Sequence, residues 1–394
     1  MSYAVDTEKC SVKLRWKIFY PRYLSYILLL FLTNWVFGDI PFKHHIIDSH
    51  GPKDPWAKII ADIDGDGDRD VIVGGRKGPL VWYAYPKWTK SVITPGGYKT
   101  VDGEAGDIDG DGDLDIVLGG LFWYENPLPR IHPSKSLWKT HKIANHPTHD
   151  IELADLNGDG RLDIVTRDQS EFGHRTGNKL YLWWQSNPKK WTHTVIECPH
   201  GEGLELADLD RDNDPDIVIG GTWYENTGQI DAVSWIPHSF AQFHPNASIA
   251  VADFNRDNRL DMVLAPAELK QQYYKIAWYE APKNPRQRNW TEHVLAEKSE
   301  AVIHSLQSAD LNNDQLPDII AAEMHQGQDP DEVILFIDQS KGHTWQKQVI
   351  SIKGSHLIQT GDIDSDGDID LMGANWSGPF QPIEFWENIY SKKK

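Results

Sequence analysis

The sequence has very little cysteine, and its Lys and Arg residues form no basic stripe in the body of the chain. Only Cys10 and Cys198 occur among 394 residues, which excludes a disulfide framework in any compartment. The formal charge of −19 argues against nucleic acid as a partner, because phosphates would be repelled. The sequence also lacks a nucleophile elbow, a His-Glu-x-x-His helix and a phosphate-binding loop. These absences exclude several common enzyme signatures and leave a binding role open.

Long apolar runs are absent except at the N-terminus. Five Lys and Arg residues between positions 9 and 22 precede "YLSYILLLFLTNWVFG". A run of roughly 15 apolar residues is short for a membrane span and typical of a secretory signal. Trp35 and Phe37 also suit an uncleaved interfacial anchor. We therefore expect residues 1–38 to be a signal peptide or membrane anchor, and the protein to be secreted, periplasmic or held at the cell surface.

One acidic segment recurs along the sequence. "ADIDGDGDRDVIVGG" (61–75) has six further copies, among them "GDIDGDGDLDIVLGG" from Gly106 and "GDIDSDGDIDLMGAN" from Gly361. The leading aspartates, 45 to 57 residues apart, are Asp62, Asp107, Asp155, Asp208, Asp253, Asp310 and Asp362. A period of this length indicates the blades of a propeller or the units of a solenoid.

Each period holds four short apolar stretches, which predicts a four-stranded antiparallel blade. The third stretch is aromatic, as in "LFWYEN" (121–126), and we expect it to pack between blades. The seventh unit ends without a fourth stretch, while "FKHHII" (42–47) stands alone ahead of the first unit. We therefore predict that residues 39–394 form an all-β, seven-bladed propeller, closed by an N-terminal strand that leaves no exposed sheet edge.

The acidic loops have the spacing of a site for a hard cation. In the first copy, carboxylates at positions 1, 3, 5 and 9 surround Gly67, which allows the sharp turn. Position 12 is apolar and strands flank the loop, so an EF-hand is excluded. Several carboxylates in a flexible loop favour calcium over magnesium. We expect up to seven structural Ca²⁺ ions.

The predicted calcium ligands are the residues at positions 1, 3, 5 and 9 of the seven loops. They are Asp62, Asp64, Asp66 and Asp70; Asp107, Asp109, Asp111 and Asp115; Asp155, Asn157, Asp159 and Asp163; Asp208, Asp210, Asp212 and Asp216; Asp253, Asn255, Asp257 and Asp261; Asp310, Asn312, Asp314 and Asp318; and Asp362, Asp364, Asp366 and Asp370. The sixth loop departs from the pattern, because Gln315 replaces the turn glycine.

The pattern D-x-[DN]-x-[DN]-G-x-x-D between two apolar stretches resembles the FG-GAP or VCBS repeat of integrin α-subunit heads, fungal propeller lectins and many secreted bacterial proteins. The resemblance covers nearly all of the chain from Phe42 to Tyr390. It implies a seven-bladed propeller with calcium in the loops between the first and second strands. Adhesins, lectins and enzymes share this repeat, so it does not define the activity.

The face opposite the acidic loops is rich in histidine. Six residues before the leading aspartates, where inner strands enter the central funnel, stand Trp56, Val101, His149, Glu202, Ala247, His304 and His356. We expect the three histidines to converge as a catalytic base or as ligands of a transition metal. Further residues of this face are expected to contact a bound ligand: Lys58, Arg76, Arg167, His200, Tyr273 and Trp376.

Three functions remain open, of which we expect the first. Aromatic and polar loops around a concave mouth suit a carbohydrate or polysaccharide. The propeller is also similar to that of aldos-2-ulose dehydratase and of propeller polysaccharide lyases. This resemblance implies proton abstraction α to a carbonyl of a uronide or keto-sugar, with Arg167 or Lys58 neutralising a carboxylate. The dehydratase's cupin domains are absent. The third function is structural adhesion, with a cell-surface protein as the partner.

Overall fold

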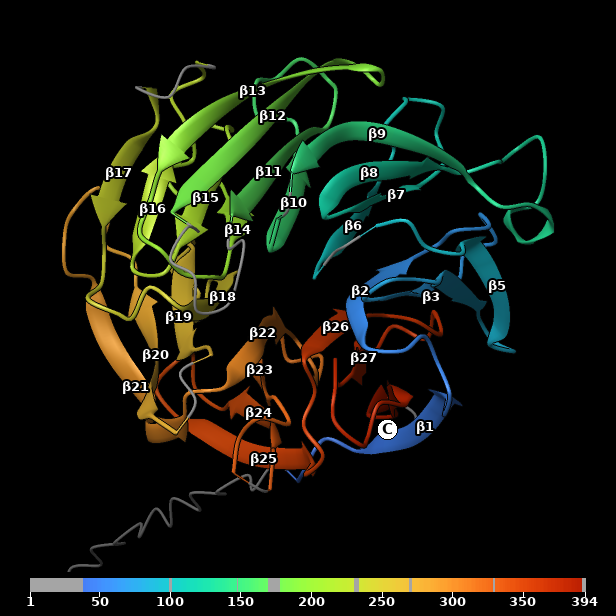
Figure 1. Ribbon diagram of the computed structural model, residues 1–394. Helices are drawn as coiled ribbons and strands as arrows, with labels where there is room; N and C mark the ends of the chain where they lie inside the picture. Colours follow the sequence, from blue (N-terminus) through green and yellow to red (C-terminus); the bar gives the residue numbers. More distant parts are fainter. Residues whose placement is uncertain are drawn as a thin grey trace, which may run out of the picture. The chain divides into compact units, whose positions relative to one another are not determined.

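The computed structural model describes residues 38–98, 101–146, 148–168, 178–229, 234–268, 271–328 and 330–391. From Asp39 onward they form seven four-stranded antiparallel sheets around a central axis (Figure 1). Apart from Gly38, the predicted signal or anchor at residues 1–38 lies outside these ranges. Within them, no helix is long and apolar enough to cross a membrane. A single turn of 3₁₀ helix, η1, spans Pro133–Lys135.

Each blade begins beside the central axis and runs outward through consecutive strands. Blades 1 to 3 consist of β2 (Pro55–Ala61), β3 (Asp70–Gly75), β4 (Leu80–Ala84) and β5 (Thr89–Thr94); β6 (Gly103–Gly106), β7 (Asp115–Leu118), β8 (Gly120–Glu125) and β9 (Lys139–His146); and β10 (Asp150–Ala154), β11 (Asp163–Asp168), β12 (Lys179–Asn187) and β13 (Lys190–Glu197).

Blades 4 to 7 follow the same order. They consist of β14 (Glu205–Ala207), β15 (Asp216–Ile219), β16 (Thr222–Glu225) and β17 (Ile236–Ser239); β18 (Ala247–Ala252), β19 (Asp261–Pro266), β20 (Tyr273–Glu280) and β21 (Thr291–Glu300); β22 (Ile303–Ala309), β23 (Asp318–Glu323), β24 (Val333–Asp338) and β25 (Trp345–Ser351); and β26 (Leu357–Gly361), β27 (Asp370–Ala374), β28 (Ile383–Asn388) and β1 (Phe42–Asp48).

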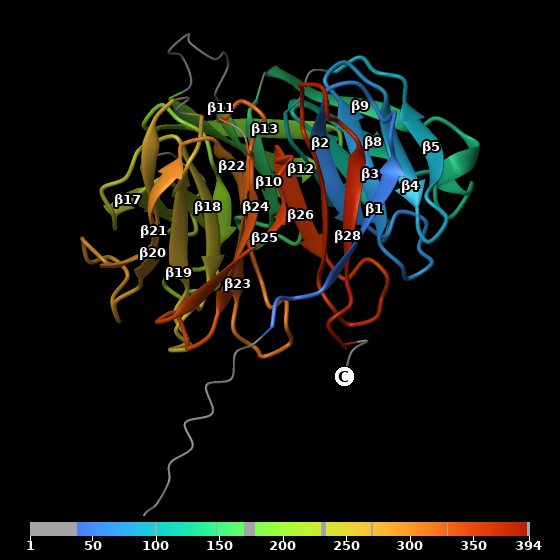
Figure 2. The same cartoon turned by 90° about the horizontal axis from the view of Figure 1, so that it is seen from below.

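The N-terminal strand closes the ring, as predicted. Strand β1 pairs antiparallel with β28, with Phe42 opposite Asn388 and His45 opposite Phe385 (Figure 2). Ile40, just ahead of β1, is buried, and its backbone N–H and C=O each bond the side chain of Gln348 at 2.8 Å. The last blade therefore takes its outer strand from the opposite end of the folded domain.

The hydrophobic core lies between neighbouring blades. Six of the seven second strands, β3 and β19 among them, are buried along their whole length, because adjacent sheets cover both of their faces. The third strands supply the largest buried side chains, which are Trp82, Trp123, Trp223, Trp278 and Trp386. This confirms that the aromatic stretches pack between blades.

The aspartate at position 9 of each acidic loop, the last one of the set, accepts hydrogen bonds that link segments of its blade. Asp115 accepts the N–H of Ile108 at 3.1 Å and that of Asn126 at 2.8 Å. The same two bonds recur in the other six copies. Asn126 also donates through Nδ2 to the carbonyl of Ile63 in the preceding blade, at 2.9 Å. Position 9 therefore stabilises the fold, whether or not it also contacts a metal.

Four histidines of the outer strands belong to the blade framework. His141 stacks on Trp123 with ring centroids 4.0 Å apart, and its Nε2 lies 2.7 Å from a carboxylate oxygen of Glu125. The same combination of Trp, His and Glu recurs at His44, His238 and His293. These contacts give the four histidines of the outer strands a structural role and distinguish them from the histidines beside the central axis.

Candidate metal and ligand sites

Each acidic loop folds back onto its first aspartate. Asp62 accepts the N–H groups of Gly65, Asp66 and Gly67 at 2.8 to 3.2 Å. The residue at position 6 has a positive φ in all seven copies, namely Gly67, Gly112, Gly160, Asn213, Asn258, Gln315 and Gly367. Gln315 has a φ of 69°, which lies in the left-handed region of backbone conformation. Glycine adopts this region without strain, whereas a residue with a Cβ atom is strained there.

Four loops gather carboxylates closely enough to hold a metal ion. Their ligand atoms lie within 4.8 Å of one another in Asp62, Asp64 and Asp66; Asp107, Asp109 and Asp115; Asp208, Asp210 and Asp212; and Asp362, Asp364 and Asp370. At position 3, the Oδ1 atoms of Asp64, Asp109 and Asp210 are buried without a hydrogen-bond partner. Burial, and then Asp66, raises the pKa of Asp64. Buried anionic oxygens without donors fit a hard cation beside them.

The third, fifth and sixth loops carry less negative charge. Asparagine occupies position 3 in all of them, as Asn157, Asn255 and Asn312. In the third loop Arg161 forms an ion pair with Asp159, and in the fifth Arg259 does so with Asp257. These neutral or cationic groups weaken the attraction for a divalent ion. In the fourth loop Arg286 likewise forms an ion pair with Asp210, so the first, second and seventh loops are the strongest metal candidates.

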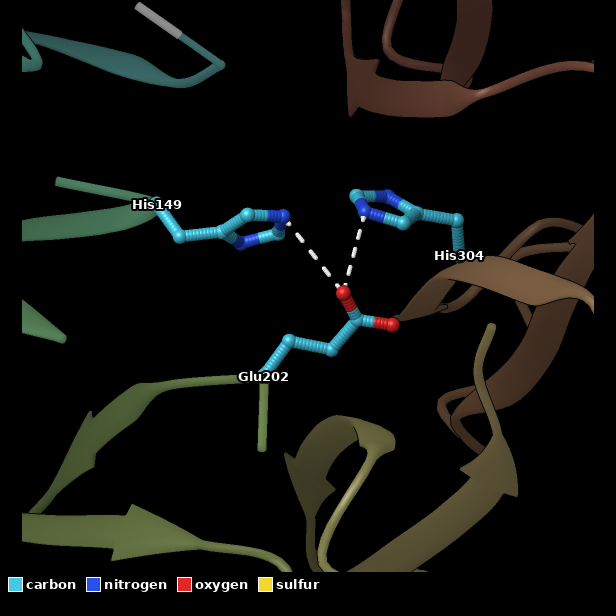
Figure 3. A group of neighbouring side chains, drawn as sticks. All are labelled: His149, Glu202 and His304. Atoms are coloured by element: carbon cyan, nitrogen blue, oxygen red, sulfur yellow. Dashed lines mark ion pairs between the residues drawn. The ribbon is translucent and has the colours of Figure 1, made fainter. Parts of the chain in front are cut away.

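At the opposite ends of the inner strands, three side chains from three blades point toward one another (Figure 3). His149 precedes β10, Glu202 precedes β14, and His304 belongs to β22. Glu202 Oε2 lies 3.4 Å from His149 Nε2 and 3.7 Å from His304 Nε2. Their side chains are 2%, 2% and 9% exposed, in the order His149, Glu202, His304. We call these three residues the His–Glu–His cluster.

The two histidines of this cluster differ in protonation. Nδ1 of His149 lies 3.0 Å from Asp150 Oδ1. Burial alone would lower the pKa of His149, but Asp150 and Glu202 outweigh it and raise that pKa to about 9. Burial, and then the nearby His149, lowers the pKa of His304 to about 3. His304 is therefore a neutral imidazole, the form that binds a metal, whereas His149 is held as an imidazolium from which a bound metal would displace the Nε2 proton.

The third predicted histidine, His356, joins this group through stacking. Its ring lies 4.1 Å from that of His304, at 24°. His356 also meets Trp376 edge-on, with ring centroids 6.2 Å apart, and Trp376 meets Trp56 at 5.7 Å. The guanidinium of Arg76 lies 4.6 Å above the Trp56 ring. The structure thus brings together the three predicted histidines and two predicted ligand contacts, Arg76 and Trp376.

A cavity of about 230 Å³ lies beside the His–Glu–His cluster, lined by His304 and His356 and by carboxylates. These carboxylates belong to Asp102, Glu104, Asp150, Glu152 and Glu205. Burial, and then Asp150, raises the pKa of Asp102 to about 7. Burial, and then Asp102, raises that of Glu205 to about 8. Burial, together with like charges in a confined space, therefore keeps part of this group of carboxylates protonated near neutral pH.

Glu205→Gln is expected to raise the melting temperature by several degrees at about pH 8.5 and to leave it unchanged at about pH 4.5. The pKa of Glu205 is higher in the folded protein than its ordinary value of 4.5, so its contribution to stability is lost as the pH rises toward 8. Glutamine keeps the shape and removes the charge. Thermal melts in calcium across this range test the prediction, with the exposed Glu297→Gln as control. A parallel shift at both pH values would contradict it.

The side chains of two predicted ligand contacts form hydrogen bonds with the protein's own backbone. Lys58 is fully buried, donates to the carbonyls of Pro55 and Trp56 at 2.7 and 3.0 Å, and has a pKa lowered by burial to about 7. Arg167 is also buried and donates to four backbone carbonyls of the connectors around residues 199–203 and 245. Both cations hold backbone in place, and their predicted contact with a ligand stays a prediction.

A groove of about 1050 Å³ lies between blades 4 and 5. Its lining is aromatic (Phe240, Phe243, Tyr274, Tyr279, Trp290) and polar (Arg167, Gln242, His244, Lys275, Asn289, Glu292). Tyr274 is 36% exposed and packs edge-on against Phe243, with ring centroids 5.0 Å apart. An exposed aromatic ring among hydrogen-bonding groups can bind an amphipathic ligand.

The predicted contacts Tyr273 and His200 are not part of this groove lining. Successive residues of a strand point to opposite faces, so Tyr273 lines a separate pocket of about 400 Å³, where Lys298 Nζ lies 4.2 Å from its ring centroid. His200 is exposed in the connector after β13. The predicted contact of Tyr273 with a ligand stays a prediction, and the direction in which β20 faces places its neighbour Tyr274 in the groove.

Several residues of these sites were missed as candidates, although the register could have identified them. Glu202 stands at the same position before its leading aspartate as His149 and His304. The cavity residues Glu104, Glu152 and Glu205 all stand three positions before theirs. The repeat position six residues before the leading aspartate therefore supplies the His–Glu–His cluster. The position three residues before it supplies three of the carboxylates that line the cavity.

Fold and acidic loops together define the class of protein: a seven-bladed β-propeller with a potential cation site in its blades. The family profile described as FG-GAP-like repeat matches residues 62–118 and 155–219. The chain therefore contains FG-GAP-like repeats in a seven-bladed propeller, a combination that fits a binding or adhesion role. Among curated proteins, none matches the sequence.

Solved structures share the propeller fold at low sequence identity. A chain in the crystal structure of BBS1N in complex with ARL6DN, soaked with mercury, is 10% identical, with a TM-score of 0.57 over 88% of this chain and 96% of that one. A chain of the Mitotic Checkpoint Complex is 11% identical, with a TM-score of 0.56 over 96% and 98%. Such likeness concerns the fold alone.

Proposed function

We propose that this protein is an exported, calcium-stabilised propeller that binds carbohydrate in the groove between blades 4 and 5. The exposed ring of Tyr274 among the groove's hydrogen-bonding side chains is the observation that carries this proposal. Calcium in the acidic loops would stabilise the blades, and ligand binding would take place at the groove. A propeller with FG-GAP-like repeats fits a binding or adhesion role, which supports the same conclusion.

The chemistry of the groove suits a sugar better than a purely apolar ligand. A pyranose presents a C–H face that packs on an aromatic ring, and Tyr274 offers such a ring. Its hydroxyls require donors and acceptors, which Gln242 and Asn289 supply. The volume of about 1050 Å³ accommodates more than one sugar ring. A short segment of a glycan or polysaccharide is therefore the proposed ligand.

Tyr274→Ala is expected to weaken glycan binding about tenfold, a loss of about 1.4 kcal/mol. The ligand is first identified on a glycan array with calcium present, and affinity is then measured by calorimetry. Tyr273→Ala is the matched control, because it removes an exposed tyrosine from the adjacent pocket and should leave affinity unchanged. Absence of glycan binding, or equal losses in both variants, would overturn the proposal.

A second candidate function is elimination on a uronide, favoured by the imidazoles of His304 and His356 in the lining of the cavity. In this reaction a histidine takes the proton α to the carboxylate, the C–O bond β to it breaks, a C=C bond forms, and the leaving oxygen gains a proton. His304, His149 or His356 would be the base. Ultraviolet absorbance of the conjugated product distinguishes this activity from binding alone.

A further inference from the structure

The distances within the His–Glu–His cluster are too long for hydrogen bonds. Glu202 Oε2 lies 3.4 and 3.7 Å from the two Nε2 atoms, whereas N–H···O bonds measure about 2.7–3.2 Å. Metal–ligand bonds of about 2.0–2.1 Å at tetrahedral angles place neighbouring ligand atoms about 3.4 Å apart. The separations therefore match the edges of a metal's coordination shell.

The groups behind the cluster orient its ligand atoms. Nδ1 of His149 lies 3.0 Å from Asp150 Oδ1, so this nitrogen donates to the carboxylate and Nε2 is the atom directed at Glu202 (Figure 3). A carboxylate behind a histidine is the usual support of a metal-binding imidazole. The stacked ring of His356 packs against His304 at 4.1 Å and restricts its rotation. Asp150 thus restrains the imidazole of His149, and His356 restrains that of His304.

One buried atom of the cluster needs an explanation. Nε2 of His304 is buried and has no hydrogen-bond partner. Buried polar atoms are normally satisfied, and an orphan in a native structure indicates a missing ion, water or reactive group. A divalent ion at this point would bond to His304, and its positive charge would offset the negative charge of the buried carboxylates of Glu202 and Asp150.

We propose that His149, Glu202 and His304 bind one divalent first-row transition-metal ion, such as zinc. Two imidazole nitrogens and one carboxylate oxygen are a donor set for such ions, whereas calcium takes oxygen ligands. This site is therefore distinct in chemistry from the acidic loops. Three protein ligands leave a coordination position open, and His304 lines the cavity of about 230 Å³, from which water or a small ligand reaches the metal.

The test is a titration of the full chain with cobalt(II), whose visible absorption changes in intensity and position when protein ligands replace its six waters with fewer donors. Transition metals are first removed with phenanthroline while excess calcium keeps the acidic loops loaded. We expect one cobalt ion per chain with a dissociation constant below about 10 µM. His304→Ala and Glu202→Gln should each weaken binding at least about 100-fold, and Asp150→Asn about 10- to 100-fold. His146→Ala, a histidine of the same face outside the cluster, should bind like the parent.

Two results would overturn the proposal: a parent protein that binds no stoichiometric cobalt, and a folded His304→Ala variant that binds it with unchanged affinity. Thermal melts in calcium establish that each variant is folded. Should His304→Ala fail to fold, Glu202→Gln and Asp150→Asn decide the question by the same titration. The cluster and the groove between blades 4 and 5 share no residue, so the result does not depend on glycan binding.

Discussion

Deletion of residues 1–48 is expected to yield an unfolded or aggregating chain, whereas deletion of residues 1–38 leaves the propeller folded. The longer deletion removes β1, so the N–H and C=O groups of β28 that pair with it lose their partners. It also removes the stacking of His44 on Trp386 and of His45 on Phe385. An unpaired edge beside uncovered aromatic side chains favours intermolecular strand pairing.

The two deletions are compared by size-exclusion chromatography and thermal melting. The shorter deletion is the control, because it retains Ile40 and its bonds to Gln348 together with all of β1. A soluble fragment 49–394 with a single cooperative transition would contradict the requirement for β1. Addition of a synthetic peptide of residues 39–48 to the fragment should restore folding if the missing strand is the only defect.

Removal of calcium is expected to lower the melting temperature by more than about 10 °C. Saturated binding to the native state contributes about 2.7 kcal/mol per site at a hundredfold excess over the dissociation constant, and four loops have the full acidic set. Seven ions would also reduce the formal charge from −19 to −5, which relieves repulsion between carboxylates. Melting with EDTA and after re-addition of calcium alone measures the effect. Unchanged melting would refute the calcium assignment.

Within the loops, Asp66→Ala should lower the melting temperature in calcium more than Asp314→Ala. Asp66 belongs to a compact set of three carboxylates, whereas Asp314 lies between Asn312 and the strained Gln315. The variants are matched, because each removes a carboxylate that accepts one hydrogen bond from the N–H two residues on, at 3.0 and 2.8 Å. The difference between them should therefore disappear in EDTA. A difference that persists there would arise from the turns and not from calcium.

The fold was predictable because its signals are local and repeated. Seven acidic loops, four apolar stretches in each period and the lone stretch "FKHHII" together specify blades, blade number and closure, and β1 to β28 follow this plan. The convergence of His149, His304 and His356 was predictable for the same reason. A shared register in a closed ring places equivalent residues around one axis, and their rings lie 5.4 and 4.1 Å apart.

The ligand contacts were less predictable, because a repeat position does not define what a long side chain reaches. Lys58 and Arg167 stand on the expected face, yet both fold back onto backbone carbonyls. Tyr273 and Tyr274 are equivalent in the sequence, and only the orientation of β20 places Tyr274 in the groove. Glu202 stood in the predicted register, but its role depends on carboxylate and imidazoles meeting from three blades.

The sequence by itself determined the all-β class, the seven blades, the closing strand and the acidic loops, because each depends on hydrophobic period, turn residues and ligand spacing within one repeat. Only the tertiary structure decided which residues of different blades meet. Glu202 reaches His149 and His304 across more than 50 and 100 residues of chain, and the groove lies between two blades. Such contacts depend on side-chain direction and packing around the closed ring, which no local pattern encodes.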